Sequence, residues 1–127
     1  MDTCILPVML YGAQTWAFNR KDMNMLNICQ RKMERKILGI SLKDRIRNTD
    51  IRNKTKIKEA MKTAHQIKWK WGGHVLRMKD DRWTHRTTIW DQRKGKRKVG
   101  RQHNRWEDDF KTELGKLWTK TARKREE

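Results

Sequence analysis

The residues best suited to hold a catalytic metal ion are two adjacent aspartates near the end of the chain. Asp108 and Asp109 close the sequence Trp-Glu-Asp-Asp at 106–109, and paired carboxylates can bind the magnesium ions of phosphoryl transfer. That chemistry also needs a third carboxylate and a tight turn between hydrophobic strands. These aspartates instead follow a basic segment and begin an amphipathic pattern. We interpret them as helix-start residues, and Asp80 and Asp81 as loop or N-cap residues.

Histidine and cysteine give no second catalytic pattern. The four histidines lack the paired spacing of a zinc site, and no serine or cysteine accompanies them as a nucleophile. Cys4 and Cys29 lie among apolar residues, so we expect both to be reduced core residues. The sequence predicts no catalytic residue, no metal, no cofactor and no small-molecule substrate.

Positive charge is the strongest chemical signal in the sequence. Lysine and arginine number 33 against 15 acidic residues, which gives a formal net charge of +18. Such a field attracts phosphates without selecting a sequence, so the expected partner is RNA, DNA or both. An anionic membrane is the rival partner, but no apolar stretch approaches the roughly 18 residues of a spanning helix. The first residues also lack the features of a signal peptide, and we expect an intracellular, nuclear protein.

A basic run between residues 93 and 105 is the clearest candidate for binding phosphates. It contains no acidic residue, and Gly95 and Gly100 allow the backbone to bend around a phosphate chain. The cluster at 94–98 also fits a nuclear-localisation signal. We predict nucleic-acid contacts, by charge or by stacking, from Lys68, Trp69, Lys70, Arg77, Arg93, Lys94, Lys96, Arg97, Lys98, Arg101 and Arg105.

The sequence holds seven tryptophans, and indole rings can stack on unpaired bases. Three fall on apolar helix faces and are expected in the core: Trp71, Trp106 and Trp118. For three others, beside basic residues, core packing and contact with bases or cations both stay open: Trp69, Trp83 and Trp90.

The elements that position these residues are predicted to be helices. Asn19 and Asp22 are suited to begin a helix that Gly39 ends. Its inner face is expected to carry Met23, Leu26, Cys29, Met33 and Ile37. A second apolar stripe has helical spacing and is expected to pack on the first: Ile57, Ala60, Met61, Ala64, Ile67 and Trp71.

The remaining segments are less regular. We expect a helix in the apolar residues 5–16, and a loop with a short capped turn at 41–55. A final amphipathic helix is expected to carry Trp106, Phe110, Leu114, Leu117 and Trp118 on one face. Because only 35% of residues are hydrophobic and 38% are charged, the core must be small and part of the chain is expected to be poorly ordered alone.

Several blocks along the chain match one family in order. Residues 6–16 end in Leu-Tyr-Gly-Ala-Gln-Thr-Trp, and residues 71–78 read Trp-Gly-Gly-His-Val-Leu-Arg-Met. Further matching blocks lie at 35–42, 44–48, 81–83, 95–97, 100–102, 105–109 and 115–118. Together they resemble the C-terminal region of non-LTR retrotransposon endonuclease–reverse transcriptases, especially the RTE-like group.

The resemblance implies a position after the palm, in the thumb and the segment beyond, where the parent enzyme grips template RNA and target DNA. The endonuclease, fingers and palm are not in this sequence, so it implies no polymerase activity from this chain alone. The chain departs from the family at Gln14, where glutamate is usual, and at Gln102, where proline is common. No cysteine–histidine knuckle follows, and Glu127 is an early end for such a tail.

We therefore predict a mainly α chain, with a thumb-like helical bundle at 1–79 and a basic tail with a C-terminal amphipathic helix at 80–127, partly disordered. Its predicted function is non-catalytic binding of nucleic acid. One alternative is a relic of a mobile element without a stable fold or activity, and another is a nuclear nucleic-acid-binding protein unrelated to polymerisation. An active fragment using Asp108 and Asp109 is a further alternative.

Overall fold

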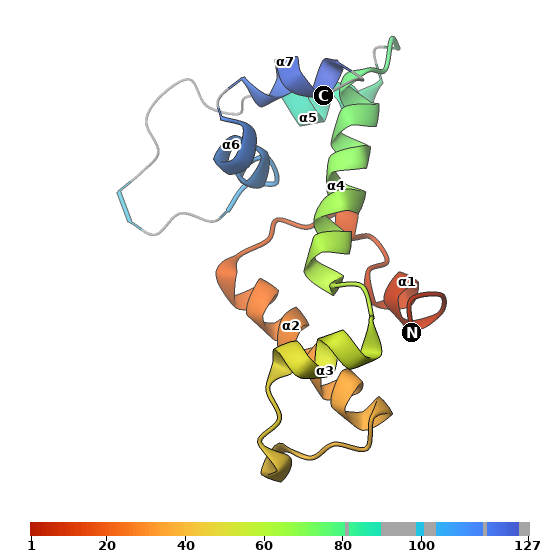
Figure 1. Cartoon of the computed structure of the whole chain (residues 1–127). Coiled ribbons are helices and arrows are strands. Elements are labelled where there is room, and N and C mark those ends of the chain that lie inside the picture. Colours follow the sequence, from red (N-terminus) through yellow and green to blue (C-terminus); the bar gives the residue numbers. More distant parts are fainter. Residues whose placement is uncertain (81, 90–98, 101–103, 116, 125–127) are drawn as a thin grey trace. The chain divides into compact units, whose positions relative to one another are not determined.

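The computed structural model describes residues 1–80, 82–89, 99–100, 104–115 and 117–124 (Figure 1). Every regular element in these ranges is helical, which confirms the mainly α class. The elements are α1 (Ile5–Met9), η1 (Ala13–Thr15), α2 (Arg20–Ile37), η2 (Leu42–Asp44), α3 (Asn48–Thr55), α4 (Ala60–Leu76), α5 (Trp83–Ile89), α6 (Asp108–Leu114) and α7 (Trp118–Arg123).

Packing divides the chain into two compact units. Unit 1 comprises residues 1–13 and 19–66, and unit 2 comprises residues 14–18 and 67–127. The first residues of α4 belong to unit 1 and the rest of that helix to unit 2. This division by packing differs from the functional boundary after residue 79, which stays a prediction.

Both ends of the long helix α2 lie where the sequence predicts them. The Asn19 side chain accepts a hydrogen bond of 2.9 Å from the backbone N–H of Asp22, which satisfies one of the free donors at the helix start. At the other end Gly39 has a φ of +65°, a conformation that glycine adopts without steric cost. Local chemistry therefore sets both ends of α2.

The inner face predicted for α2 is wrong in part. The fully buried residues of this helix are Gln30 and Glu34, whereas Cys29 is exposed and Ile37 is 57% exposed. The Gln30 carboxamide donates to the Lys58 carbonyl and accepts from the Ala60 N–H, both at 2.8 Å. A polar side chain is buried here because it satisfies backbone groups at the start of α4.

Neither cysteine lies in the core. Cys4 and Cys29 are both exposed free thiols, which corrects the prediction of two core residues. The prediction relied on the apolar neighbours of the two cysteines. In α2 the apolar positions extend beyond the face that the helix buries, so they do not place Cys29 in the core. Met23, Leu26 and Met33, predicted for the same inner face, are half-buried.

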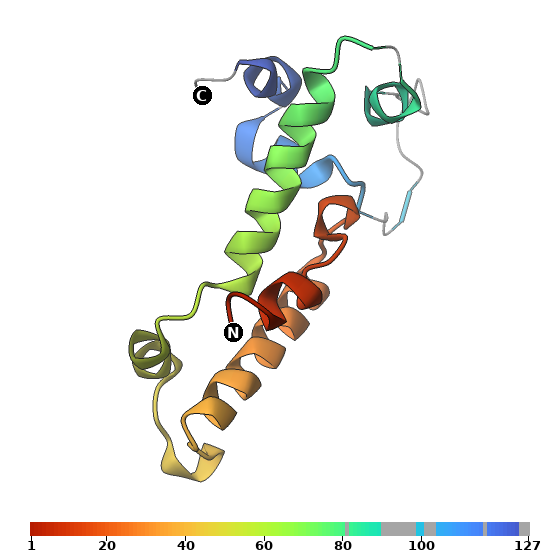
Figure 2. The same ribbon diagram turned by 90° about the vertical axis from the view of Figure 1, so that its right-hand side faces the viewer.

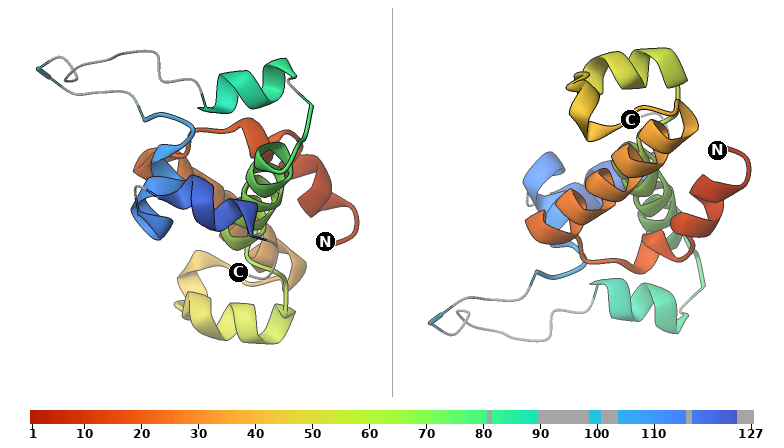
Figure 3. Two further views of the ribbon diagram at one scale, coloured as in Figure 1. Left: turned by 90° about the horizontal axis from the view of Figure 1, so that it is seen from above. Right: turned by 90° about the horizontal axis from the view of Figure 1, so that it is seen from below.

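The remainder of unit 1 packs around α2. Figure 1 shows α3 crossing α2, and in the right panel of Figure 3 α1 and α3 lie on different sides of it. Buried Ile51 of α3 lies beside Arg52, whose guanidinium is 3.9 Å from the Glu34 carboxylate and 3.5 Å from that of Glu59. The helix predicted at 5–16 is confirmed in part, as α1 and η1.

The segment predicted as a loop with a capped turn contains more helix than expected. Ser41 and Asp44 form a complete capping box at η2, which confirms the turn. The helix α3 then follows over Asn48–Thr55. Ile51 is its one fully buried residue, so the segment shows no apolar stripe from which the sequence could predict a helix.

The second apolar stripe is confirmed at the start of α4. Ala60, Met61 and Ala64 are buried in unit 1, and Ile57 is half-buried. The hydrogen bonds that join this region to α2 come from Gln30. The two stripes are therefore linked by a polar side chain, where the sequence predicted apolar packing.

Unit 2 has an aromatic core. Leu76, Phe110 and Trp118 are buried together, with Trp106 and Ala122 packed against them. The rings of Phe110 and Trp118 stack with centroids 4.6 Å apart. In Figure 2, α5 and α7 lie on different sides of the C-terminal part of α4.

The single helix predicted over 106–118 is wrong, because Gly115 breaks it into α6 and α7. Gly115 has φ +76° and ψ −172°, a conformation essentially restricted to glycine. The break directs Phe110 and Trp118 into one core, while Leu117 is 62% exposed. Among the described residues, none of the helices combines the length and the apolar character needed to cross a membrane.

Candidate nucleic-acid interface

Lys68, one of the predicted contacts, is fully buried in unit 2. Its Nζ atom lies 2.5 Å from Oδ2 of Asp109 and 5.3 to 5.5 Å from the ring centroids of Phe18, Trp106 and Phe110. We call these four residues the Lys68 cage. A buried ammonium group needs such a partner and such faces, because desolvating it otherwise costs several kcal/mol. Because Lys68 is fully buried, a phosphate could contact it only after unit 2 opened, and its role in binding stays a prediction.

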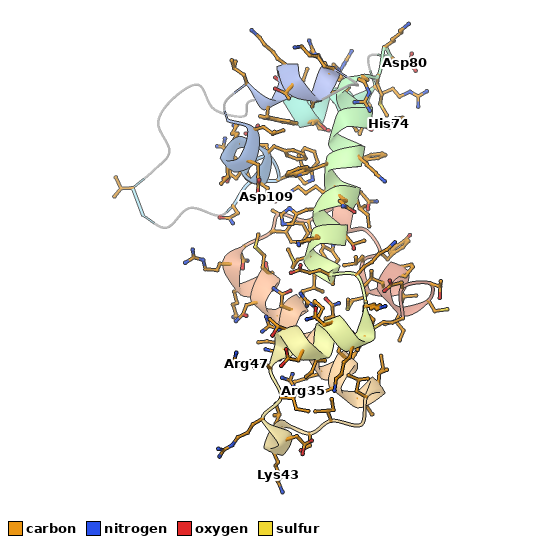
Figure 4. The ribbon with its side chains drawn as sticks, viewed as in Figure 1. Arg35, Lys43, Arg47, His74, Asp80 and Asp109 are labelled. Atoms are coloured by element: carbon orange, nitrogen blue, oxygen red, sulfur yellow. The ribbon has the colours of Figure 1, made fainter. Side chains whose placement is uncertain are left out.

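The aspartates at the start of α6 have structural partners. Asp109 extends from α6 (Figure 4) and forms the ion pair with Lys68. Asp108 accepts a hydrogen bond of 2.7 Å from the backbone N–H of Arg105. Both lie in the first turn of α6, as predicted. Among the residues that the structure describes, no three side chains of histidine, cysteine, aspartate or glutamate form a group that could hold a metal ion.

The other predicted contacts of α4 lie nearer the surface. Lys70 is exposed, and Trp69 is 36% exposed with its ring tilted against that of Phe110. Arg77 is exposed and donates a hydrogen bond of 2.9 Å to the carbonyl of Ala122, which fastens the segment after α4 to α7. Arg77 therefore has a structural contact as well as an exposed charge.

Within the basic run, the structure describes residues 99–100 and 104–105. Arg105 is half-buried and lines a hollow of unit 2. The other predicted contacts of the run lie outside the described residues: Arg93, Lys94, Lys96, Arg97, Lys98 and Arg101. Trp90 also lies outside them.

The hollow beside Arg105 has a volume of about 440 Å³, and we call it the indole hollow. Its lining residues all belong to unit 2: Gln14, Thr15, Trp71, Thr87, Thr88, Arg105, Trp106 and Glu107. Trp71, predicted in the core, is 37% exposed, while Trp106 is half-buried and Trp118 is buried as predicted. Trp83 is 77% exposed, with the Arg86 guanidinium 5.6 Å from its ring centroid.

A basic groove on unit 1 was not among the sequence predictions. This α2 groove has a volume of about 510 Å³ and is lined by Ile28, Arg31, Lys32, Arg35, Lys36, Ile40, Leu42 and Asn48. The four cations were visible in the sequence, because positions 31, 32, 35 and 36 recur on one side of a helix. That spacing is the signal that could have identified the groove.

The electrostatics of the α2 groove favour an anion. Four cations and no acidic residue line it within the described part of the chain. The Arg35 guanidinium donates to Oδ1 of Asn48, which fixes one wall. Figure 4 shows that Lys43 and Arg47, which are exposed, lie in the same part of unit 1 as Arg35. An extended anion fits this arrangement better than a small neutral ligand does.

Comparison with known proteins gives one clear similarity. No family model matches the chain, and no solved structure matches it. The chain is 33% identical over 117 residues to a protein of Caenorhabditis elegans described as a putative uncharacterized transposon-derived protein. The match covers 89% of this chain but only 42% of that relative, so the chain spans less than half of the relative's length. This similarity indicates an origin in a transposable element.

Proposed function

We propose that this chain is a non-catalytic, nucleic-acid-binding part of a non-LTR retrotransposon reverse transcriptase. The α2 groove carries the proposal, because it gathers Arg31, Lys32, Arg35 and Lys36 around one surface with no acidic residue in its lining among the described residues. Lysine and arginine that neutralise phosphates release condensed counterions, and this release drives binding without base recognition. The partner is RNA, DNA or both.

The origin of the chain supports the same function. Its relative is described as transposon-derived, and its ordered sequence blocks resemble the thumb and post-thumb region of the reverse transcriptases. A thumb grips nucleic acid for an active centre located elsewhere in its enzyme. In this proposal polymerisation and cleavage belong to other domains. This chain binds the nucleic acid, and it does so in the nucleus.

A salt titration of matched variants tests the α2 groove. Lys32 and Lys36 are exposed and line the groove, whereas Lys21 and Lys54 are exposed on unit 1 outside its lining. Each pair changed to glutamine removes the same charge. Lys32→Gln with Lys36→Gln should weaken duplex binding about tenfold and make the slope of log affinity against log salt shallower by about 1.8, at about 0.9 per lost phosphate contact.

The control, Lys21→Gln with Lys54→Gln, should change both quantities much less. Equal losses in the two double variants would mean that net charge alone attracts the ligand. If the unaltered protein binds neither RNA nor DNA at low ionic strength, the proposed function is wrong.

The basic segment at 93–105 adds further contacts in this proposal. The matched experiment changes its predicted contacts to glutamine: Arg93, Lys94, Lys96, Arg97, Lys98, Arg101 and Arg105. If about five of them meet phosphates, the slope should become shallower by about 4.5 on duplex. Unchanged affinity and slope would remove the segment from the interface.

A further inference from the structure

We propose that the indole hollow of unit 2 holds one unpaired nucleobase, stacked on Trp71, and so makes the chain prefer single strands to duplex. This inference rests on the proposed function, since it takes nucleic acid as the partner. It adds a site for the base to the charged surface that holds phosphates. The α2 groove cannot provide this preference, because phosphates occur on every strand.

The size and the walls of the hollow fit a planar aromatic ligand. Its volume of about 440 Å³ lies within the range of ~300–1,000 Å³ that is usual for ligand pockets. Trp71 is exposed over about a third of its surface although it lies on a helix with a buried face. An exposed indole in a concave site is a stacking platform for a base, whose π-face is available only when it is unpaired and unstacked.

The second indole of the hollow is fixed in place. The Trp106 Nε1–H donates a hydrogen bond of 2.6 Å to the carbonyl of Gln14. The same ring packs on Phe110 with centroids 4.9 Å apart and on Trp118 at 6.3 Å. A wall held by a hydrogen bond and by two aromatic neighbours loses little conformational entropy when a ligand binds.

Polar groups also line the hollow. The Thr87 and Thr88 hydroxyls donate to carbonyls of their own helix, Thr88 to Thr84 at 2.7 Å, so their oxygens remain acceptors. Glu107 adds a carboxylate whose Oε1 lies 2.5 Å from Nζ of Lys111. These acceptors suit the N–H edges that bases expose when they are unpaired.

Arg105 extends the site from the base to the strand. Arg105 belongs to the lining of the hollow, and its backbone N–H donates a hydrogen bond to the Asp108 carboxylate. A cation beside an aromatic platform is the combination that single-strand binding surfaces use, with the charge on the phosphate and the ring on the base.

The test compares a single-stranded oligonucleotide with a hairpin duplex of equal phosphate count at one salt concentration. Trp71→Ala should weaken single-strand binding by about 5- to 150-fold, which is the equivalent of ~1–3 kcal/mol per stacked base at 1.4 kcal/mol per tenfold. Duplex binding should stay unchanged. The fluorescence of a 2-aminopurine base in the single strand should be quenched when the unaltered protein binds. The Trp71→Ala variant should quench it less.

Tyr11→Ala is the control, because Tyr11 is an exposed aromatic residue that does not line the hollow. It should leave single-strand affinity unchanged, and an equal loss would overturn the inference. Thr87→Phe is a second variant, which fills the hollow from an exposed position and should lower single-strand affinity even if Trp71→Ala unfolds. Equal binding of single strand and duplex by the unaltered protein would refute the inference and leave the proposed function intact.

Discussion

The two units bury polar groups in different ways. In unit 1 the fully buried side chains of α2 are Gln30 and Glu34. The Gln30 side chain forms hydrogen bonds with backbone groups at the start of α4. Among the described residues of unit 2, Lys68 is the fully buried polar side chain, enclosed by aromatic rings and by one carboxylate. Each unit thus gives one buried polar side chain, Gln30 or Lys68, specific partners from another segment of the chain.

The difference also decides what each unit exposes. The fully buried residues of α2 are Gln30 and Glu34, and four cations of the same helix line the α2 groove, with Lys32 and Lys36 exposed and Arg31 and Arg35 half-buried. All seven tryptophans lie within unit 2, some in the core and others at its surface. In the function that we propose, unit 1 would contact phosphates and unit 2 would contact a base as well.

Removing the carboxylate that neutralises Lys68 is the change expected to cost most. Asp109→Asn leaves a buried ammonium group without its counter-charge and should lower the free energy of unfolding by about 3–5 kcal/mol. Urea unfolding followed by tryptophan fluorescence measures it, because every tryptophan belongs to unit 2. Glu113→Gln, an exposed carboxylate of the same helix, is the control. A loss below about 1 kcal/mol would show that unit 2 does not depend on the pair.

Removing the amide of Gln30 tests the corresponding contact of unit 1. Gln30→Leu keeps the bulk but leaves the Lys58 carbonyl and the Ala60 N–H without partners, so it should cost about 1–3 kcal/mol. Hydrogen exchange at the Ala60 amide should become faster, whereas exposed Asn24→Ala should leave that rate unchanged. An unaltered exchange rate in Gln30→Leu would mean that the apolar residues alone hold α4 to unit 1.

The smallest effect is expected from a second ion pair of unit 2. Lys111 lies 2.5 Å from Glu107, the same distance as Lys68 from Asp109, but its side chain is 40% exposed where that of Lys68 is buried. Lys111→Gln should cost at most about 0.5 kcal/mol in the same urea titration. A cost close to that of Asp109→Asn would show that ion pairing alone, and not burial, makes the Lys68 cage important.

Features that depend on neighbouring residues could be predicted from the sequence. The ends of α2 follow from Asn19, Asp22 and Gly39, and the apolar start of α4 follows from its spacing. The break at Gly115 was also visible as a glycine inside an amphipathic pattern. The regular spacing of the apolar residues on both sides of Gly115 nevertheless predicts one continuous helix.

Features that depend on distant partners could not be predicted. Lys68 is basic and lies beside Trp69, so the sequence places it among binding residues, and its partner Asp109 follows 41 residues later. Gln30 is polar, and its buried partners lie 28 and 30 residues away. The candidate site divides in the same way. The cations of α2 share a helix face that the sequence shows, whereas the indole hollow joins residues from separate parts of unit 2.

The Lys68 cage has a practical consequence for a protein so rich in amines. Acylating reagents modify ammonium groups that solvent can reach, so exposed Lys32 and Lys36 should be labelled while Lys68 is shielded. Mass spectrometry of the labelled protein would then detect opening of unit 2 through one side chain. The rate at which Lys68 is acylated would therefore report how fast its aromatic surroundings become exposed to solvent.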